Sequence, residues 1–392
     1  MTRFTIFAIA LSGLTLGGTP AGAEAFQPYG RGPHCVGSTR FEVAEAFGDI
    51  GDDAMRKYLS GLPDRFIDQI LQDPESSWVI EVDIPDDSVY GTAAGQRMPM
   101  AAFLTFPAKC SESPRPYRFP FADSQYGAFE DMLKSAERPR FADPDAKYPL
   151  IIHSHGMTAH GIYDVGHAHG LASHGYVVAV LFYGDNRFHA VPGMLMHAFL
   201  RPLFTRAALD AILESEHFGS RINHERIGIT GHSLGGFTAL ALAGAPFHGN
   251  PATVHDPRIG AAVLAAPWVG DPSEDGVPPA FGPQNRDLDR VTIPVLTLFG
   301  TSDEATPASL TLPAVRYLSG PSYVVELIDQ PHVFEQGSWA DRDNWELLFF
   351  SAFLKDDPAS LKLLNTASSA AGGNADRQLF DYQAPAGNHG SK

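Results

Sequence analysis

The sequence is poor in basic residues, and long apolar runs are rare in it. Its 392 residues include 28 Lys and Arg against 45 Asp and Glu, which gives a net charge of −17. Nucleic acids and anionic membranes are bound by clustered positive charge, so this balance argues against both as partners. Beyond residue 23 no stretch reaches the roughly 18 apolar residues that a membrane span needs, so we expect no stable membrane insertion. The composition leaves the oligomeric state open.

The one long apolar run lies at the start of the chain. Arg3 precedes the run FTIFAIALSGLTLGG, and the small residues Ala21–Ala23 follow it. This order of a basic, an apolar and a small-residue region is typical of a secretory signal peptide. We therefore predict a signal peptide over residues 1–23, cleavage after Ala23, and a secreted or periplasmic mature protein.

Cysteine is scarce, with only Cys35 and Cys110 in the chain. Cys35 precedes an expected strand at residues 36–45, and Cys110 follows another at residues 98–108. Were these strands antiparallel neighbours, both cysteines would lie at the same end. In an oxidising compartment Cys35 and Cys110 are therefore candidate partners in a disulfide.

From residue 148 onward, short strands rich in β-branched residues and Leu alternate with helical stretches. This alternation predicts an α/β fold with a mostly parallel central sheet, helices on both faces and antiparallel strands at the N-terminus. We expect one catalytic domain over residues 24–356 with insertions at about 46–97 and 111–147. The second insertion contains a short helical patch near GAFEDMLKSA, and the tail at residues 357–392 reads as loose. The apolar stretch 191–204 suits either a lid or simple packing.

A G-x-S-x-G pattern, GHSLG at residues 231–235, stands between an expected strand and a helix rich in small residues. A strand–turn–helix of this kind lifts the serine hydroxyl clear of the sheet, and glycine tolerates the crowding on either side. Ser233 is thus the candidate nucleophile, and the Leu234 N–H is placed to stabilise negative charge beside it.

A serine nucleophile needs a base and a carboxylate that orients the base. Asp303 follows one late strand and His332 follows the next, and parallel strands end at the same sheet edge as the serine. We predict the triad Ser233, Asp303 and His332. Asp271 is the main competing acid, and the neighbouring Glu304 is expected to point elsewhere.

The segment HSHGMTAHG at residues 153–161 holds three histidines, as many metal sites do. It contains no Asp or Glu, and the chain has no H-E-x-x-H motif. A turn after this strand normally supplies the second oxyanion-hole amide, here that of Met157. We therefore expect neither a catalytic metal nor another cofactor, and we interpret the histidines as structural.

Together, HGMTAHG, LASHGYVVAV, GHSLGG, AAPW, GTSDEATP and a late histidine resemble the α/β-hydrolase superfamily over roughly residues 99–355. The likeness is strongest to the branch of platelet-activating-factor acetylhydrolases, dienelactone-hydrolase-like esterases and bacterial cutinase-like polyester hydrolases. The resemblance implies the triad and oxyanion residues named above, and it places Trp268 on the pocket wall of the polyester hydrolases. Serine in place of cysteine argues against a true dienelactone hydrolase, and Met157 stands where the polyester hydrolases usually carry an aromatic residue.

These features predict a secreted serine hydrolase of carboxylic esters, with an apolar pocket that includes Trp268 and Phe334. Its substrate could be a small ester, a lipid such as a platelet-activating-factor-type phospholipid, or a polyester. A peptidase or acyltransferase is an alternative, although peptidases of this fold usually carry a propeller or large cap and the chain has no internal repeat. A catalytically silent binding module is the other, and the intact triad argues against it.

Overall fold

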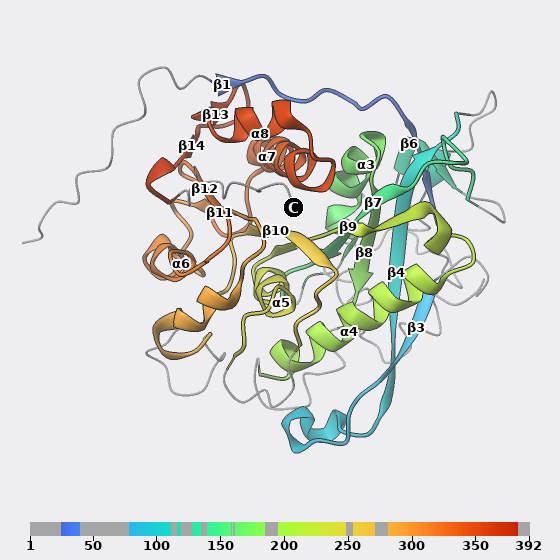
Figure 1. Cartoon of the computed structure of the whole chain (residues 1–392), viewed down its shortest axis with the longest axis horizontal. Helices are drawn as coiled ribbons and strands as arrows, with labels where there is room; N and C mark the ends of the chain where they lie inside the picture. Colours follow the sequence, from blue (N-terminus) through green and yellow to red (C-terminus); the bar gives the residue numbers. More distant parts are fainter. Residues whose placement is uncertain are drawn as a thin grey trace, which may run out of the picture.

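The computed structural model describes residues 25–39, 78–110, 116–118, 128–134, 139–157, 159, 161–184, 195–247, 254–270 and 281–382 (Figure 1). The predicted signal peptide at 1–23 and residues 46–77 of the first insertion lie outside these ranges. None of the helices in the described ranges combines the length and the apolar character needed to cross a membrane.

The strands form one large sheet and a separate two-stranded one. The large sheet has the order β14-β12-β11-β10-β9-β7-β8-β4-β2-β6-β5, with β3 also paired to β4, and β1 pairs with β13 in the small one. The six strands from β12 to β8 run parallel. The strand bounds are β1 Ala25–Phe26, β2 Cys35–Ser38, β3 Trp78–Asp83, β4 Arg97–Ala108, β5 Pro116–Arg118, β6 Ala128–Lys134, β7 Tyr148–Ser154, β8 Val177–Phe182, β9 Ile222–His232, β10 Ile259–Ala265, β11 Val295–Gly300, β12 Ser322–Leu327, β13 Ser369–Ala370 and β14 Asp376–Gln378.

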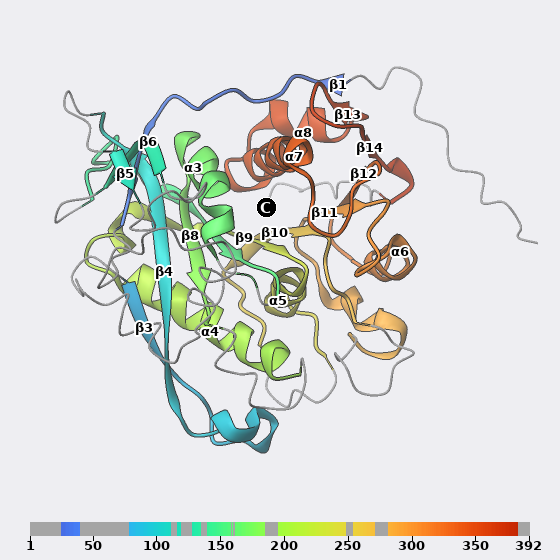
Figure 2. The same ribbon diagram turned by 180° about the vertical axis from the view of Figure 1, so that it is seen from behind.

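Helices cover both faces of the sheet (Figures 1 and 2). Helices α4, α5 and α6 pack on one face and α3, α7 and α8 on the other, and each face buries its own hydrophobic cluster. The helix bounds are α3 Val165–Ser173, α4 Leu195–Glu214, α5 Leu234–Leu242, α6 Ala308–Val315, α7 Gln336–Leu354 and α8 Pro358–Leu364, with short 3-10 turns at Ser88–Ala93, Gly161–Asp164, Gly219–Arg221, Pro283–Arg290 and Phe380–Tyr382. This arrangement confirms the predicted α/β fold.

The central strands are buried on both sides because they carry apolar residues without alternation. All residues of β8, VVAVLF, and of β11, VLTLFG, are buried, as expected for strands covered on both faces. Short parallel strands of this kind end together, so the turns that follow β9, β11 and β12 lie at one edge of the sheet. The predicted nucleophile, acid and base follow these three strands.

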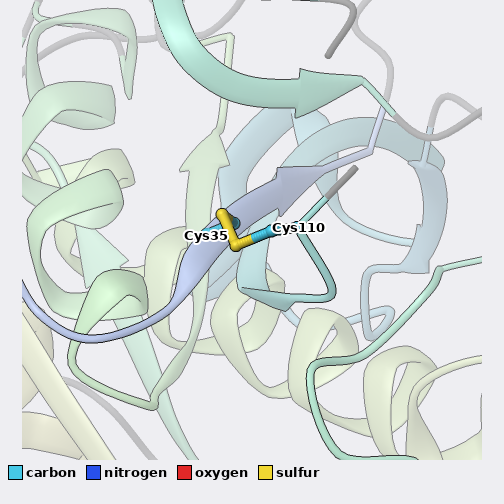
Figure 3. The surroundings of a disulfide bond; sticks show 2 residues. All are labelled: Cys35 and Cys110. Carbon is cyan, nitrogen blue, oxygen red and sulfur yellow. A yellow bond between two sulfur atoms is a disulfide. The ribbon is translucent and has the colours of Figure 1, made fainter. Parts of the chain in front are cut away.

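The N-terminal strands lie antiparallel, as predicted, and they bring the two cysteines together. Strand β2 pairs antiparallel with β4, with Cys35 opposite Ala108, and Cys35 forms a disulfide with Cys110 across a Cα–Cα distance of 5.3 Å (Figure 3). The bridge closes a loop of 75 residues. Removing this loop entropy from the unfolded chain is worth about 4 kcal/mol.

One local expectation in the second insertion was wrong. The patch near GAFEDMLKSA is not helical: Ala128–Lys134 forms β6, which pairs with β2 and β5, because pairing with neighbouring strands overrides a local helical preference. The first insertion contains β3, which pairs with the same edge of β4 as β2 does.

The tail is not loose over residues 357–382. Helix α8 packs on α7 with Leu364 completely buried, and β14 pairs antiparallel with β12. This pairing covers the backbone edge that β12 would otherwise leave open. Residues 383–392 lie outside the described ranges.

The apolar stretch 191–204 is described from Leu195, where α4 begins. Ala198, Phe199, Leu200 and Phe204 are buried in the core, so this part of the stretch packs against the domain. A lid function for the preceding residues is a prediction outside the described part of the chain.

Candidate active site

Ser233 lies in the tight turn between β9 and α5. Its backbone has φ 53° and ψ −118°, the strained conformation that a nucleophile elbow uses. A Cβ on Gly231 would lie 2.3 Å from the backbone of Gly235, and a Cβ on Gly235 would lie 1.9 Å from the Ser154 carbonyl oxygen. The two glycines of the motif are therefore a steric requirement of the turn.

His332 and Asp303 lie beside Ser233. The His332 Nε2 atom is 2.9 Å from Ser233 Oγ, and Nδ1 is 2.8 Å from Asp303 Oδ2. Backbone contact between the two late turns fixes this geometry: Ser302 N–H donates to the Gln330 carbonyl, and Gly300 leaves no room for a Cβ there. The three predicted residues thus form one continuous hydrogen-bonded chain.

The carboxylate of Asp303 is anchored independently of His332. Oδ1 accepts the backbone N–H groups of Ala305 and Thr306 at 2.8 Å each, and Oδ2 accepts the Thr306 hydroxyl at 2.6 Å. Burial opposes ionisation, but the hydrogen bonds from His332 and Thr306 outweigh it and lower the pKa of Asp303 to about 2. Thr306 was not identified from the sequence, although an Asp-x-x-Thr spacing is a recognisable turn signal.

Of the competing acids, Glu304 is exposed, whereas Asp303 is 4% exposed and directed at His332. Asp271 lies outside the described residues.

The turn that carries Met157 lies against the elbow. A Cβ on Gly156 would be 3.5 Å from the Ser233 Cβ and 2.9 Å from the His232 ring. Leu234 is the first residue of α5, so its N–H has no intrahelical acceptor. Leu234 and Gly156, the residue before Met157, therefore flank the serine, and the direction of the two oxyanion-hole N–H groups stays a prediction.

His232 is a residue of this site that sequence reasoning did not single out. Its Nε2 is 2.8 Å from the His332 carbonyl oxygen, and the two rings lie 4.8 Å apart. Burial and the neighbouring His332 lower the pKa of His232 to about 4, so it is neutral at neutral pH and its Nε2–H donates to the carbonyl. The backbone of the candidate base is held by this contact.

The two predicted pocket residues lie close to the triad. The backbone N–H of Trp268 donates to the Ser233 carbonyl at 2.9 Å, and Trp268 and Thr306 both line a cavity of about 10 Å³. Phe334 is 4% exposed and packs edge-on against His232. Their contact with substrate stays a prediction.

The histidines near β7 contact acidic groups and carbonyls. His153 Nε2 is 2.9 Å from Asp164 Oδ2, and His167 is 2.7 Å from Asp343 and 3.0 Å from Glu346. Within the described ranges, which omit His160, no group of three or more His, Cys, Asp or Glu is arranged to hold a metal.

His167 is charged in this buried cluster. Burial lowers its pKa, and so does the nearby Arg342, but the carboxylates of Glu346 and Asp343 outweigh both and raise it to about 9. The cluster ties α3 to α7 behind β7 with paired charges.

Residues 125–190 match the family model of platelet-activating factor acetylhydrolase, isoform II. The matched segment includes β7, the Met157 turn, α3 and β8, and it ends before Ser233, Asp303 and His332. No curated protein matches the chain. The match supports an acyl hydrolase of the serine hydrolase type.

Proposed function

We propose that the chain is an exported serine hydrolase of the α/β-hydrolase superfamily that cleaves carboxylic esters through an acyl-enzyme. The observation that carries this proposal is the hydrogen-bonded chain from Ser233 Oγ through His332 to Asp303. A serine in an elbow, a base within reach of its proton and a carboxylate behind the base are the requirements of nucleophilic acyl transfer.

In acylation, Ser233 Oγ attacks the ester carbonyl carbon while His332 Nε2 takes the hydroxyl proton. The carbonyl oxygen becomes an oxyanion, which the N–H groups of Met157 and Leu234 stabilise. When the tetrahedral intermediate collapses, the bond to the alcohol oxygen breaks and His332 returns the proton to the leaving alcohol. Asp303 keeps the Nδ1–H tautomer, which leaves Nε2 free to accept.

In deacylation, water takes the place of the alcohol. His332 accepts a proton from the water as it attacks the acyl carbon, and the proton passes to Ser233 Oγ as the acid leaves. Each oxyanion donor in such a site is worth about 10²–10³ in rate.

The family match favours a lipid-type ester with a short acyl group, because the matched family is described as an acetylhydrolase of platelet-activating factor. A polyester or a small soluble ester is the competing substrate. A series of p-nitrophenyl esters from acetate to laurate, with one acetylated phospholipid and one polyester film, separates these substrates.

Residues 1–23 have the order of regions of a signal peptide, and the Cys35–Cys110 disulfide is in keeping with an oxidising compartment. N-terminal sequencing of the protein recovered outside the cytoplasm is expected to begin at Glu24. A recovered protein that still begins at Met1 would contradict cleavage at this site.

The enzyme assay compares the wild type with Ser233→Ala and with a control, Ser302→Ala. The control replaces the exposed serine that directly precedes Asp303. We expect the wild type and Ser302→Ala to hydrolyse p-nitrophenyl acetate and to react with a fluorophosphonate probe, and Ser233→Ala to do neither. Turnover of peptide substrates in preference to esters would indicate a peptidase, and transfer of the acyl group to an added alcohol at the expense of hydrolysis would indicate an acyltransferase. A wild type that is silent towards esters and the probe would point to a binding module and overturn the proposal.

A further inference from the structure

Arg201 is a completely buried arginine on α4 that belongs to no part of the triad. Its guanidinium donates through Nη1 to the His155 carbonyl and through Nη2 to the Gly156 carbonyl, the latter at 2.9 Å. These are the last two carbonyls before Met157. A buried charge with a long side chain is costly to place, so contacts of this kind call for an explanation.

The Gly156 carbonyl and the Met157 N–H belong to the same peptide unit. A trans peptide is planar, and its C=O and N–H point in opposite directions. A donor that fixes the carbonyl on one side therefore fixes the N–H on the other. The Gly156 carbonyl also accepts the Ala159 N–H at 3.3 Å and lies 2.7 Å from His155 Nδ1. Arg201 adds a charged donor to these contacts, and charged donors form the stronger hydrogen bonds.

The guanidinium is itself held in place. Its Cζ lies 4.7 Å from the centroid of the Tyr183 ring, and the Tyr183 hydroxyl lies 2.9 Å from Ser154 Oγ and 2.8 Å from Thr205 Oγ1. Thr205 Oγ1 in turn donates to the Arg201 carbonyl. A guanidinium presents its donors in a rigid planar fork, whereas the lysine ammonium is a compact charge on a flexible stem, so arginine fixes the direction of two consecutive carbonyls better than lysine does.

The geometry points to Arg201 as a positioning residue of the oxyanion hole: it clamps the Gly156–Met157 peptide so that the Met157 N–H faces the ester oxygen at Ser233. This inference rests on the proposed function. Arg201 acts through the peptide and does not touch the substrate, so its loss should impair transition-state stabilisation far more than substrate binding.

The test uses Arg201→Leu and Arg201→Lys in the full chain, with Phe199→Leu as the matched control. Phe199 is a buried residue of the same helix and packs against Phe247, so this variant changes the packing of α4 and leaves the hydrogen bonds of the guanidinium in place. For p-nitrophenyl acetate we expect kcat to fall about 100-fold in Arg201→Leu and about tenfold in Arg201→Lys, with KM within about threefold of wild type. Phe199→Leu should stay within about threefold in both. If Arg201→Leu does not fold, the intermediate Arg201→Lys carries the test.

Two further measurements separate positioning from general damage. The affinity for a trifluoromethyl ketone, which forms an oxyanion on the serine, should weaken in parallel with kcat/KM, while an unreactive methyl ether of the same shape should bind as before. A crystal structure of the Arg201 variant should show the Gly156–Met157 peptide rotated. An unrotated peptide, or a KM effect that equals the kcat effect, would overturn the inference. A wild type that neither hydrolyses esters nor reacts with a fluorophosphonate would instead refute the proposed function, and the peptide orientation would still decide the role of Arg201.

Discussion

Replacing Asp303 by asparagine tests how the site holds the tautomer of His332. The carboxylate oxygen Oδ1 accepts two backbone N–H groups, from Ala305 and Thr306, and Oδ2 faces His332 Nδ1. An asparagine carbonyl oxygen must occupy the first position, because an amide NH₂ cannot face two fixed N–H donors. The NH₂ group is thereby forced towards His332.

An NH₂ group facing Nδ1 makes that atom an acceptor and moves the ring proton to Nε2. The protonated Nε2 then faces Ser233 Oγ, 2.9 Å away, and cannot take its proton. The same wrong tautomer in a Ser-His-Asp triad lowers kcat by about 10⁴, which is about 5.5 kcal/mol of activation free energy. Thr306 can still donate to the Ala266 carbonyl, at 3.1 Å, so the fold should survive.

The assay is steady-state hydrolysis of p-nitrophenyl acetate by Asp303→Asn, with the melting temperature as a check on folding. Glu304→Gln is the matched control, because that side chain is adjacent and exposed, and it should keep wild-type activity. An Asp303→Asn variant within about tenfold of wild type would refute the tautomer argument. Equal loss in Asp271→Asn would show that the acid was assigned to the wrong strand end.

Further predictions concern the turn, the support of the base, the disulfide and the buried charges. Gly235→Ala puts a Cβ 1.9 Å from a backbone oxygen, and we expect kcat to fall by roughly 100-fold because the elbow must shift. His232→Leu should lower kcat about tenfold by the loss of one hydrogen bond, whereas His232→Gln, which retains a neutral donor, should lose less; equal activity of both would argue against this support. Replacing Cys35 and Cys110 by serine should cost about 4 kcal/mol of unfolding free energy, measured by denaturant titration against the reduced wild type, which should match the variant. The pKa of His167 in the folded protein is raised from 6.5 to about 9. Its contribution to stability, on the order of 3 kcal/mol, is therefore complete below pH 6.5 and is lost as the pH rises through 9. The melting temperature of His167→Gln should lack this decrease at alkaline pH, and a decrease identical to that of the wild type would contradict the assignment.

The residues of the candidate triad could be predicted from the sequence because each follows a strand that its own short run of apolar residues identifies. Continuous apolar runs identify the parallel strands, and parallel strands end at one edge, so Ser233, Asp303 and His332 had to meet there. The order of the two cysteines relative to their strands led in the same way to the disulfide. These inferences needed only the strand positions and their common direction.

Predictions failed where pairing partners come from distant parts of the chain. Strand β6 forms against β2, roughly a hundred residues earlier, and β14 forms against β12. A short segment of mixed composition carries no local signal for such pairing, because the partner edge supplies the hydrogen bonds. The expected helical patch and the loose tail were wrong for this reason.

The fold class, the turn of the candidate nucleophile and the order of the candidate acid and base could be predicted, since these depend on short-range patterns and on the geometry of parallel strands. The contacts that orient these residues became visible only in the packed fold. His232 holds a carbonyl 100 residues away, and Arg201 holds carbonyls 46 and 45 residues away. Hydrogen bonds of this kind leave no spacing in the chain, because their geometry is fixed by the packing of α4 and the late turns against one sheet edge.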